Sequence, residues 1–191
     1  RRVCAGEIIQ TLRRGSTDVT LADYRRVIDL KTAELFRVSC QLGSQLGDCP
    51  PAYSEAAGRF GRHLGLAYQI YDDLADDFGE EKRIGKTLGS DLASGKLTLP
   101  LLVLLDRLTA GERAVLLDEI RGSRPPQLPL HLHQMAVHGV FPLVAEAVQT
   151  EIAAAIAALA PWPQLAPTPL LLSLGDVLRS QVAALQAPAG T

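Results

Sequence analysis

A dense group of carboxylates lies in the middle of the chain. Asp72, Asp73, Asp76 and Asp77 are close together, and Asp72 and Asp76 would share one helix face. Like charges at this spacing destabilise a helix by about 0.2–0.5 kcal/mol per pair, so a compensating cation is expected. Mg²⁺ suits these ligands, because it takes oxygen donors, often only one or two carboxylates, and completes its shell with water and phosphate. The alternative is a solvated acidic helix end.

The charged, glycine-rich segment that follows supplies the cations that such a site would need. Lys86 follows Gly85, and Lys96 follows Gly95. Lysine is a compact cation that binds phosphate, and glycine lets the backbone approach an anion closely. Either lysine alone would be interpreted as an exposed surface charge. Together with the carboxylates, the two lysines predict a cage for a metal-bound diphosphate.

Several motifs, in this order, resemble the trans-type polyprenyl diphosphate synthases. The sequence D-D-L-A-D from Asp72, preceded by A-Y-Q-I-Y and followed by I-G-K-T-L-G-S-D-L-A-S-G-K-L-T-L-P, resembles their second aspartate-rich region. Upstream, residues 31–36 match the K-T-x-x-L-F segment of that family, and residues 6–10 resemble its G-[EQ]-x-x-[DQ] element. The resemblance covers almost the whole chain, although beyond Leu108 it rests on helical character alone. It implies an all-α, isoprenoid-synthase-type helical bundle.

The resemblance also implies an activity and a metal. The expected enzyme is a Mg²⁺-dependent prenyltransferase that condenses an allylic prenyl diphosphate with isopentenyl diphosphate, head to tail, in chain elongation. Asp72 would coordinate magnesium directly, and Asp73 and Asp76 would act mainly through metal-bound water. The chemistry is coherent, because ionising a carbon–oxygen bond needs a leaving diphosphate whose charge is neutralised by metal and lysine.

Substrate-binding roles follow from the same resemblance. Lys31, Lys86 and Lys96 would contact diphosphate oxygens of the allylic substrate. Thr32 and Gln69 would lie beside the reacting carbon, where their oxygens can stabilise a developing allylic cation. The expected catalytic group comprises Asp72, Lys31, Thr32 and Gln69.

One part of the family pattern does not occur in this sequence. The family normally has a first aspartate-rich region on an earlier helix, and no second D-D-x-x-D occurs here. Residue 1 is Arg, and the only methionine is Met135. We therefore expect residues 1–191 to be the C-terminal part of a single all-helical domain whose N-terminal helices are missing. Full activity is expected only with that missing region, in a protein that is typically homodimeric.

A second function remains open at this point. The chain could belong to a non-catalytic partner or regulatory subunit of a heteromeric prenyl synthase that has lost half of the site. The presence of Lys31, Gln69, Lys86 and Lys96 together with the aspartates argues against this alternative, because an idle site has no evident reason to keep costly clustered charge.

Bulk composition limits the remaining classes. The 191 residues carry a net charge of −2 with scattered basic residues, which argues against nucleic-acid binding. Three cysteines without a C-x-x-C pair argue against disulfides and zinc, and they fit a reducing cytoplasm. The apolar run from Leu97 to Leu105 is short and interrupted by Pro100, so no stable membrane insertion is expected.

Hydrophobic periodicity and punctuation predict helices in nearly every segment. Two capping boxes are expected, at Thr20 with Asp23 and at Thr109 with Glu112. The predicted helices run to about residue 13, from 20 to about 42, from 52 to 77, from 97 to 108, along an apolar stripe from 144 to 159, and from 170 to 185.

Overall fold

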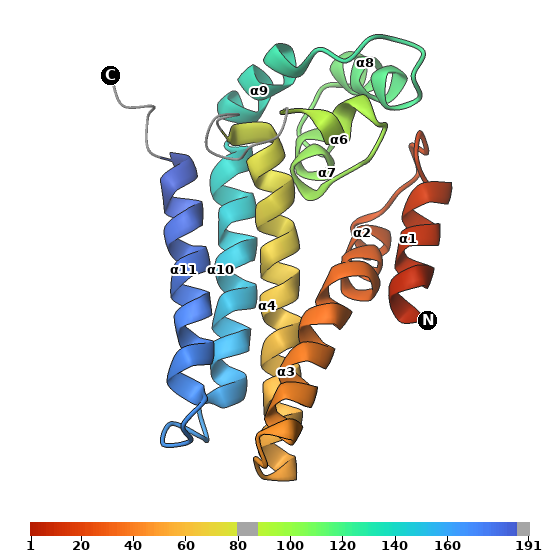
Figure 1. The fold of residues 1–191 in the computed structure, drawn as a ribbon. Helices are drawn as coiled ribbons and strands as arrows, with labels where there is room; N and C mark the ends of the chain where they lie inside the picture. Colours follow the sequence, from red (N-terminus) through yellow and green to blue (C-terminus); the bar gives the residue numbers. More distant parts are fainter. Residues whose placement is uncertain (80–87, 187–191) are drawn as a thin grey trace.

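The computed structural model describes residues 1–79 and 88–186, and within these ranges all regular structure is helical, as predicted (Figure 1). The elements are α1 (Arg2–Leu12), α2 (Leu21–Ile28), η1 (Asp29–Ala33), α3 (Glu34–Leu46), α4 (Pro51–Phe78), α6 (Ser90–Ala93), α7 (Leu99–Leu105), α8 (Ala110–Ile120), α9 (Leu128–Val137), α10 (Val140–Leu159) and α11 (Thr168–Gln186).

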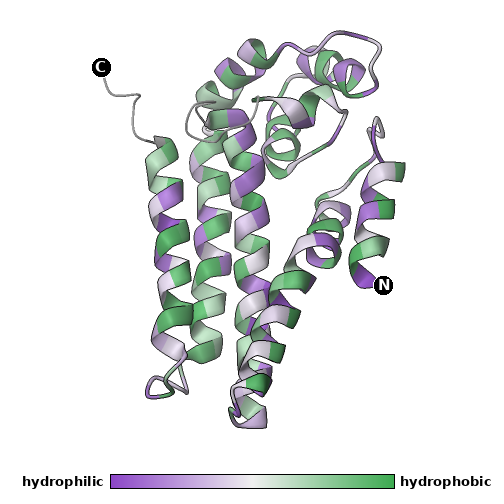
Figure 2. Ribbon diagram, viewed as in Figure 1, coloured by the Kyte–Doolittle hydropathy of each residue, from purple (hydrophilic) through white to green (hydrophobic). Residues whose placement is uncertain are grey.

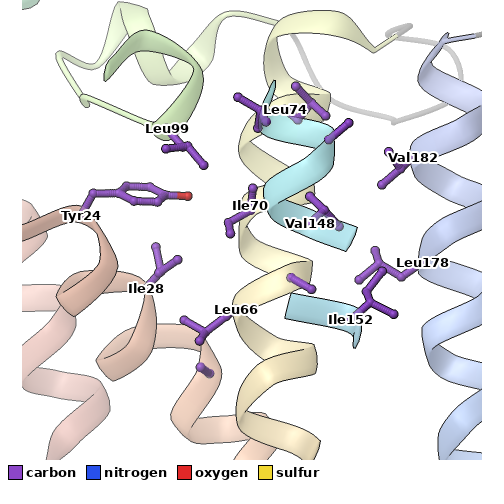
Figure 3. Packing of buried hydrophobic residues seen from close by; sticks show 14 of the residues in the cluster. Tyr24, Ile28, Leu66, Ile70, Leu74, Leu99, Val148, Ile152, Leu178 and Val182 are labelled. Carbon is purple, nitrogen blue, oxygen red and sulfur yellow. The ribbon is translucent and has the colours of Figure 1, made fainter. Parts of the chain in front are cut away.

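Helix α4 is the centre of the arrangement. Helices α10 and α11 lie on one side of it, and α3, α2 and α1 lie on the other (Figure 1). Phe60 and Leu64, which the sequence places on an apolar stripe, are buried. Farther along α4, Ile70 and Leu74 have Tyr24 of α2 on one side and side chains of α10 and α11 on the other (Figure 3). One hydrophobic core therefore runs along α4.

The C-terminal end of α4 differs from the rest of that helix. Its last turns are coloured as hydrophilic in Figure 2, and they carry the aspartates singled out in the sequence. Short helices α6 and α7 pack beside this end. The fold therefore places the acidic turn where the segment after residue 88 returns to α4.

Both predicted capping boxes are confirmed. Thr20 Oγ1 accepts a hydrogen bond from the Asp23 backbone N–H at 3.1 Å, and an Asp23 carboxylate oxygen accepts from the Thr20 N–H at 3.0 Å. Thr109 and Glu112 form the same reciprocal pair at the start of α8. These local signals set the first residues of α2 and α8, because they satisfy backbone donors that a helix leaves unpaired.

Two helices depart from the sequence expectations. Helix α9 was not among the predicted helices. Helix α10 is long and apolar enough, by length and composition, to cross a membrane, with a mean hydropathy of 1.5 over its most apolar window. From the sequence, only the run from Leu97 to Leu105 was considered, and Val140–Leu159 was missed as a longer apolar helix. In this structure α10 packs against α4 and α11.

The predicted helix from residue 20 to 42 is interrupted by one turn of π-helix. The π turn η1 includes Lys31 and Thr32, and α3 continues directly from it. π turns inside helices are rare and occur frequently at functional sites. The apolar periodicity of this segment gave no sign of the wider turn, so the sequence predicted the helix and missed its irregularity.

A methyl group added at Gly61 is expected to push α3 away from α4. An alanine Cβ there would lie 2.4 Å from the Phe36 carbonyl oxygen and 2.9 Å from Cys40 Sγ. We expect Gly61→Ala to lower the free energy of unfolding by about 1–3 kcal/mol in urea denaturation. Gly43→Ala is the control, because its Cβ would meet nothing within 4 Å, and it should raise the free energy by about 0.5–1 kcal/mol. Equal effects would contradict the close packing of the two helices.

Candidate functional site

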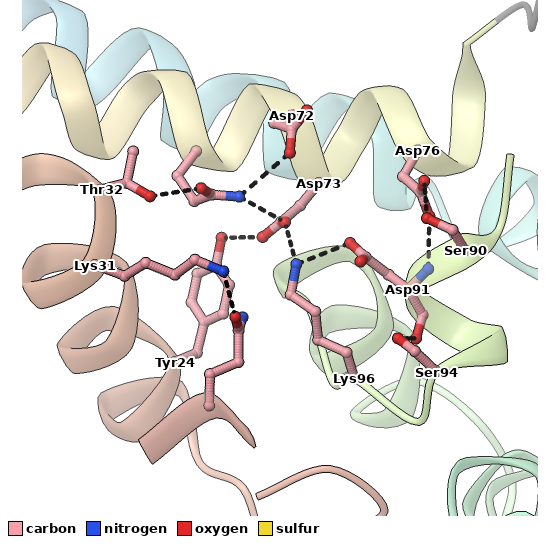
Figure 4. Close-up of polar contacts among 12 residues, drawn as sticks. Tyr24, Lys31, Thr32, Asp72, Asp73, Asp76, Ser90, Asp91, Ser94 and Lys96 are labelled. Atoms are coloured by element: carbon pink, nitrogen blue, oxygen red, sulfur yellow. Dashed lines mark hydrogen bonds and ion pairs between the residues drawn. The ribbon is translucent and has the colours of Figure 1, made fainter. Parts of the chain in front are cut away.

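Asp73 is the centre of the polar site. Its side chain is completely buried, and it accepts hydrogen bonds from three different directions (Figure 4). Tyr24 Oη donates to one carboxylate oxygen at 2.7 Å, and Lys96 Nζ and Gln69 Nε2 each donate to the other at 3.0 Å. Burial, followed by the neighbouring Asp73 charge, raises the pKa of Tyr24 well above its ordinary value. The phenol therefore stays protonated and keeps donating to Asp73.

Lys96 joins the acidic turn to the segment that follows it. Its ammonium group also donates to Asp91 at 2.9 Å. Burial alone would lower the pKa of Lys96, but the carboxylates of Asp73 and Asp91 outweigh burial and raise that pKa above its ordinary value. The side chain is therefore a permanent cation held between two carboxylates.

A close backbone contact at Gly95 fixes the position of the Lys96 backbone. Gly95 has a φ of +68°, and its carbonyl oxygen accepts a hydrogen bond from the Gly15 N–H at 2.9 Å. A Cβ at Gly95 would lie 2.7 Å from the Ile120 carbonyl oxygen. Glycine is needed here for both the left-handed conformation and the close approach. The glycine that precedes the lysine thus positions the cation.

Asp76 holds the start of α6 against the end of α4. Ser90 Oγ donates to one of its carboxylate oxygens at 2.8 Å, and the Asp91 N–H donates to the other at 3.0 Å. The Asp76 carbonyl oxygen also accepts from the Gly89 N–H at 2.9 Å. Neighbouring Asp77 is almost fully buried, and burial followed by the charge of Asp76 raises its pKa well above the ordinary value. The acidic turn and the segment after residue 88 therefore meet.

Gln69 links the π turn to the carboxylates. Thr32 Oγ1 donates to the Gln69 amide oxygen at 2.7 Å, and the amide nitrogen donates to Asp73 at 3.0 Å and to Asp72 at 3.5 Å. This orientation is consistent at both ends, because the amide oxygen faces a hydroxyl and the amide nitrogen faces carboxylates. The predicted neighbours Thr32 and Gln69 are thus in direct contact.

Lys31 extends from η1 into the same region (Figure 4). Its Nζ donates to the Gln10 amide oxygen at 2.6 Å and lies 2.9 Å from a Glu7 carboxylate oxygen. Both partners belong to the G-E-x-x-Q element of α1. Lys31 is about one-third exposed. Both partners of its ammonium group therefore lie on α1, and none of the contacts described joins Lys31 to the aspartates of α4.

The structure brings together nearly all residues that the sequence singled out. Lys86 lies outside the described residues, so its predicted role stays a prediction. The sequence reasoning gave no role in the site to Tyr24 or to Ser90. The only available signal was the hydroxyl group in each side chain, and that signal does not identify a partner. The residues brought together around α4 are Lys31, Thr32, Gln69, Asp72, Asp73, Asp76 and Lys96.

The donor set limits how a metal ion could be held. Within residues 1–79 and 88–186, no three acidic, histidine or cysteine side chains converge to form a metal cage. Asp73 and Asp76 have both carboxylate oxygens bonded to protein donors. Asp72 is partly exposed, and the hydrogen bond that it accepts from Gln69 is long, at 3.5 Å. These residues fit a cation that one carboxylate holds and that water and phosphate complete, as is common for Mg²⁺.

Comparisons with known proteins agree with this geometry. The family model described as Polyprenyl synthetase matches residues 1–129. Octaprenyl diphosphate synthase of Escherichia coli (strain K12) is 33% identical over 162 residues, which are 84% of this chain and 50% of that protein. Heptaprenyl diphosphate synthase component 2 of Geobacillus stearothermophilus is 41% identical over 115 residues, or 59% of this chain and 36% of that protein.

A solved structure extends the similarity to the fold. A polyprenyl synthase from Caulobacter crescentus CB15, complexed with calcium and isoprenyl diphosphate, matches with a TM-score of 0.86 and 30% identity. The match covers 94% of this chain and 56% of that chain. The present chain therefore spans about half the length of the E. coli relative and of this structure.

Removal of the cation at the centre of the site is expected to destabilise the fold. In Lys96→Met, the buried Asp73 carboxylate loses its cation, so the free energy of unfolding should fall by about 3 kcal/mol in urea denaturation. The double variant Lys96→Met/Asp73→Asn should lose less, because the completely buried charge of Asp73 is removed together with its cation and only the partly exposed Asp91 is left without Lys96. Arg13→Met removes an exposed pair with Asp18 and should change the free energy by less than about 1 kcal/mol. An undiminished loss in the double variant would contradict charge pairing as the cause.

Proposed function

Because the chain belongs to the polyprenyl synthetase family, we propose that the protein containing it is a prenyltransferase that lengthens an allylic prenyl diphosphate with isopentenyl diphosphate. The predicted family and the all-α fold are confirmed by the family match and by the similarity to solved polyprenyl synthases. The reaction itself is a proposal for this protein, since the chain corresponds to about half of its relatives.

One observation carries the proposal. Lys96, which follows α6, contacts the acidic end of α4 at Asp73. Gln69, which is hydrogen-bonded to Thr32, also donates to Asp73. A diphosphate needs cations, and a developing allylic cation needs oxygen atoms that do not react with it. The site supplies ammonium groups at Lys31 and Lys96 and neutral oxygens at Thr32 and Gln69. Lys96 has three N–H donors, and Asp73 and Asp91 take two of them, so one is left for phosphate.

Each of these residues would have its own role in the reaction. A divalent metal held at Asp72, with Asp73 and Asp76 acting through water, would neutralise charge on the diphosphate. Lys31 and Lys96 would bind its oxygens while the allylic carbon–oxygen bond breaks and the diphosphate leaves with the electron pair. The isopentenyl double bond then forms the new carbon–carbon bond, and loss of a proton restores the alkene.

The proposal also includes the identity of the metal ion, the cellular location of the protein and its oligomeric state. The Caulobacter relative was complexed with calcium and isoprenyl diphosphate, which supports divalent-metal dependence, and the oxygen donors favour Mg²⁺. We further propose a cytoplasmic homodimer. The relative described as component 2 of a heptaprenyl diphosphate synthase supports an alternative, in which this protein works as one subunit of a heteromeric synthase.

Substitution of Asp72 tests the metal assignment. We expect Asp72→Ala, in the protein that contains this chain, to lower kcat by at least about 10²-fold with little change in Tm, because the Asp72 side chain is partly exposed. Product formation from an allylic diphosphate, isopentenyl diphosphate and Mg²⁺ measures activity. Asp18→Ala removes an exposed carboxylate and should leave both quantities unchanged. A parallel fall in activity and Tm would assign Asp72 a structural role instead.

Removal of the metal tests the reaction class. Treatment of the same protein with EDTA should abolish product formation, and excess MgCl₂ should restore it, because the diphosphate cannot leave with its charge unneutralised. Product that persists in EDTA would exclude the metal-dependent mechanism. Absence of product at every metal concentration, with product appearing only after a second subunit is added, would favour the heteromeric alternative.

A further inference from the structure

Asp29, the first residue of the π turn, bridges two helices. Arg2 of α1 contacts one of its carboxylate oxygens at 3.3 Å, and Arg62 of α4 contacts the other at 2.5 Å. Asp29 is mostly buried, with 19% of its side chain exposed. Both of its oxygens are therefore occupied by cations from neighbouring elements, so the carboxylate joins η1 to α1 and to α4.

The same elements are joined a second time on the site side of the turn. Lys31 contacts Glu7 and Gln10 of α1, and Thr32 contacts Gln69 of α4. Residues two positions apart in a helix do not face each other, so Asp29 and Lys31 lie on different faces of η1. The turn is thus held between α1 and α4 twice. Asp29 forms ion pairs with both helices on one face, and Lys31 and Thr32 contact the same two helices on the site side.

Two glycines bring the backbone of the turn into close contact with its neighbours. A Cβ at Gly6 of α1 would lie 2.6 Å from the Lys31 backbone nitrogen, and a Cβ at Gly65 of α4 would lie 2.7 Å from Ala33 Cα. The turn therefore has no room to move toward either helix. The backbone of the turn could still advance by one residue along its own helical path. Such a shift in register rotates each side chain about the helix axis by about 100°. Such a rotation would carry Lys31 away from Glu7 and Gln10.

We infer that Asp29 is a positioning residue, whose ion pairs with Arg2 and Arg62 hold the register of the π turn and thereby aim Lys31 at the diphosphate site. The inference rests on the proposed function for the ligand of Lys31, although the placement of Lys31 can be measured without any ligand. Asp29 itself touches neither the acidic turn nor Lys96 in the hydrogen bonds and ion pairs described. It acts through the turn.

The first experiment measures the placement of Lys31 directly. The rate of acetylation of its amine by acetic anhydride is followed by mass spectrometry in the unchanged chain, in Asp29→Ala and in the milder Asp29→Asn. The rate should rise on the order of tenfold in Asp29→Ala, the factor that corresponds to 1.4 kcal/mol, because the amine loses Glu7 and Gln10. An unchanged rate in both folded variants overturns the inference.

A matched control separates register from general destabilisation. Glu151 is another buried carboxylate with two basic partners, Arg25 at 2.8 Å and His63 at 2.8 Å, and it makes no contact with η1 among the hydrogen bonds and ion pairs described. Glu151→Gln should lower Tm as Asp29→Ala does, and it should leave Lys31 acetylation within about twofold of the unchanged chain. An equal rise in the control would show that Lys31 responds to loosening of the fold, and it would also overturn the inference.

The second experiment connects placement to ligand binding. Calorimetry with inorganic pyrophosphate and Mg²⁺ should show about tenfold weaker binding for Asp29→Ala. In the Lys31→Ala background, the same substitution should change the affinity by less than about twofold, because there is no ammonium group left to misplace. An undiminished effect in that background counts against the inference. If the unchanged chain binds no pyrophosphate, the proposed function loses support, and the acetylation rates still decide the role of Asp29.

Discussion

The buried carboxylate of Asp73 is the constraint on which the rest of the site depends. A charged carboxylate without water is tolerated only when cations and hydrogen-bond donors surround it. The donors come from three places in the sequence, namely Tyr24 in α2, Gln69 in α4 and Lys96 after α6. Satisfying this one group therefore requires α2, α4 and the segment before α7 to meet. That same meeting point places the cation and the Thr32–Gln69 pair beside the acidic turn.

Close backbone packing is the second constraint, and it acts on the side of the site opposite the acidic turn. Gly6 and Gly65 allow α1 and α4 to approach the π turn, and Gly95 allows the chain to pass against Gly15 and Ile120. A polar side chain on such a segment has little freedom to move, because its own backbone cannot shift without a clash. The ammonium groups of Lys31 and Lys96 are thus held in place through their backbones as well as through their hydrogen bonds, which is how a rigid site for a charged ligand can be built without a metal cage of protein ligands.

The sequence predicted those features that depend on neighbours within a few residues. The capping box at Thr20, the apolar stripe of α4 and the acidic turn belong to this group. The π turn could not be predicted, because residues 29–33 contain no helix-breaking residue and the wider turn depends on contacts with α1 and α4. The role of Tyr24 could not be predicted for a similar reason, because its hydrogen bond to Asp73 spans 49 positions of sequence. Lys96 was expected to bind phosphate, and its carboxylate partners appear only when the chain is folded.

The clustered aspartates of α4 are stabilised partly by the protein itself. Repulsion within the cluster suggested that a bound cation must compensate it. In the folded chain, Lys96 neutralises Asp73, and the Ser90 hydroxyl and the Asp91 N–H satisfy Asp76. The protein itself therefore stabilises two of the four clustered carboxylates, Asp73 and Asp76, without a metal ion. Asp72 differs from Asp73 and Asp76 in being partly exposed, and it is therefore the carboxylate of this group to which the proposal assigns the metal ion. Side chains that are already held in place would let the proposed site bind a ligand without first having to reorganise, which is the condition for electrostatic catalysis.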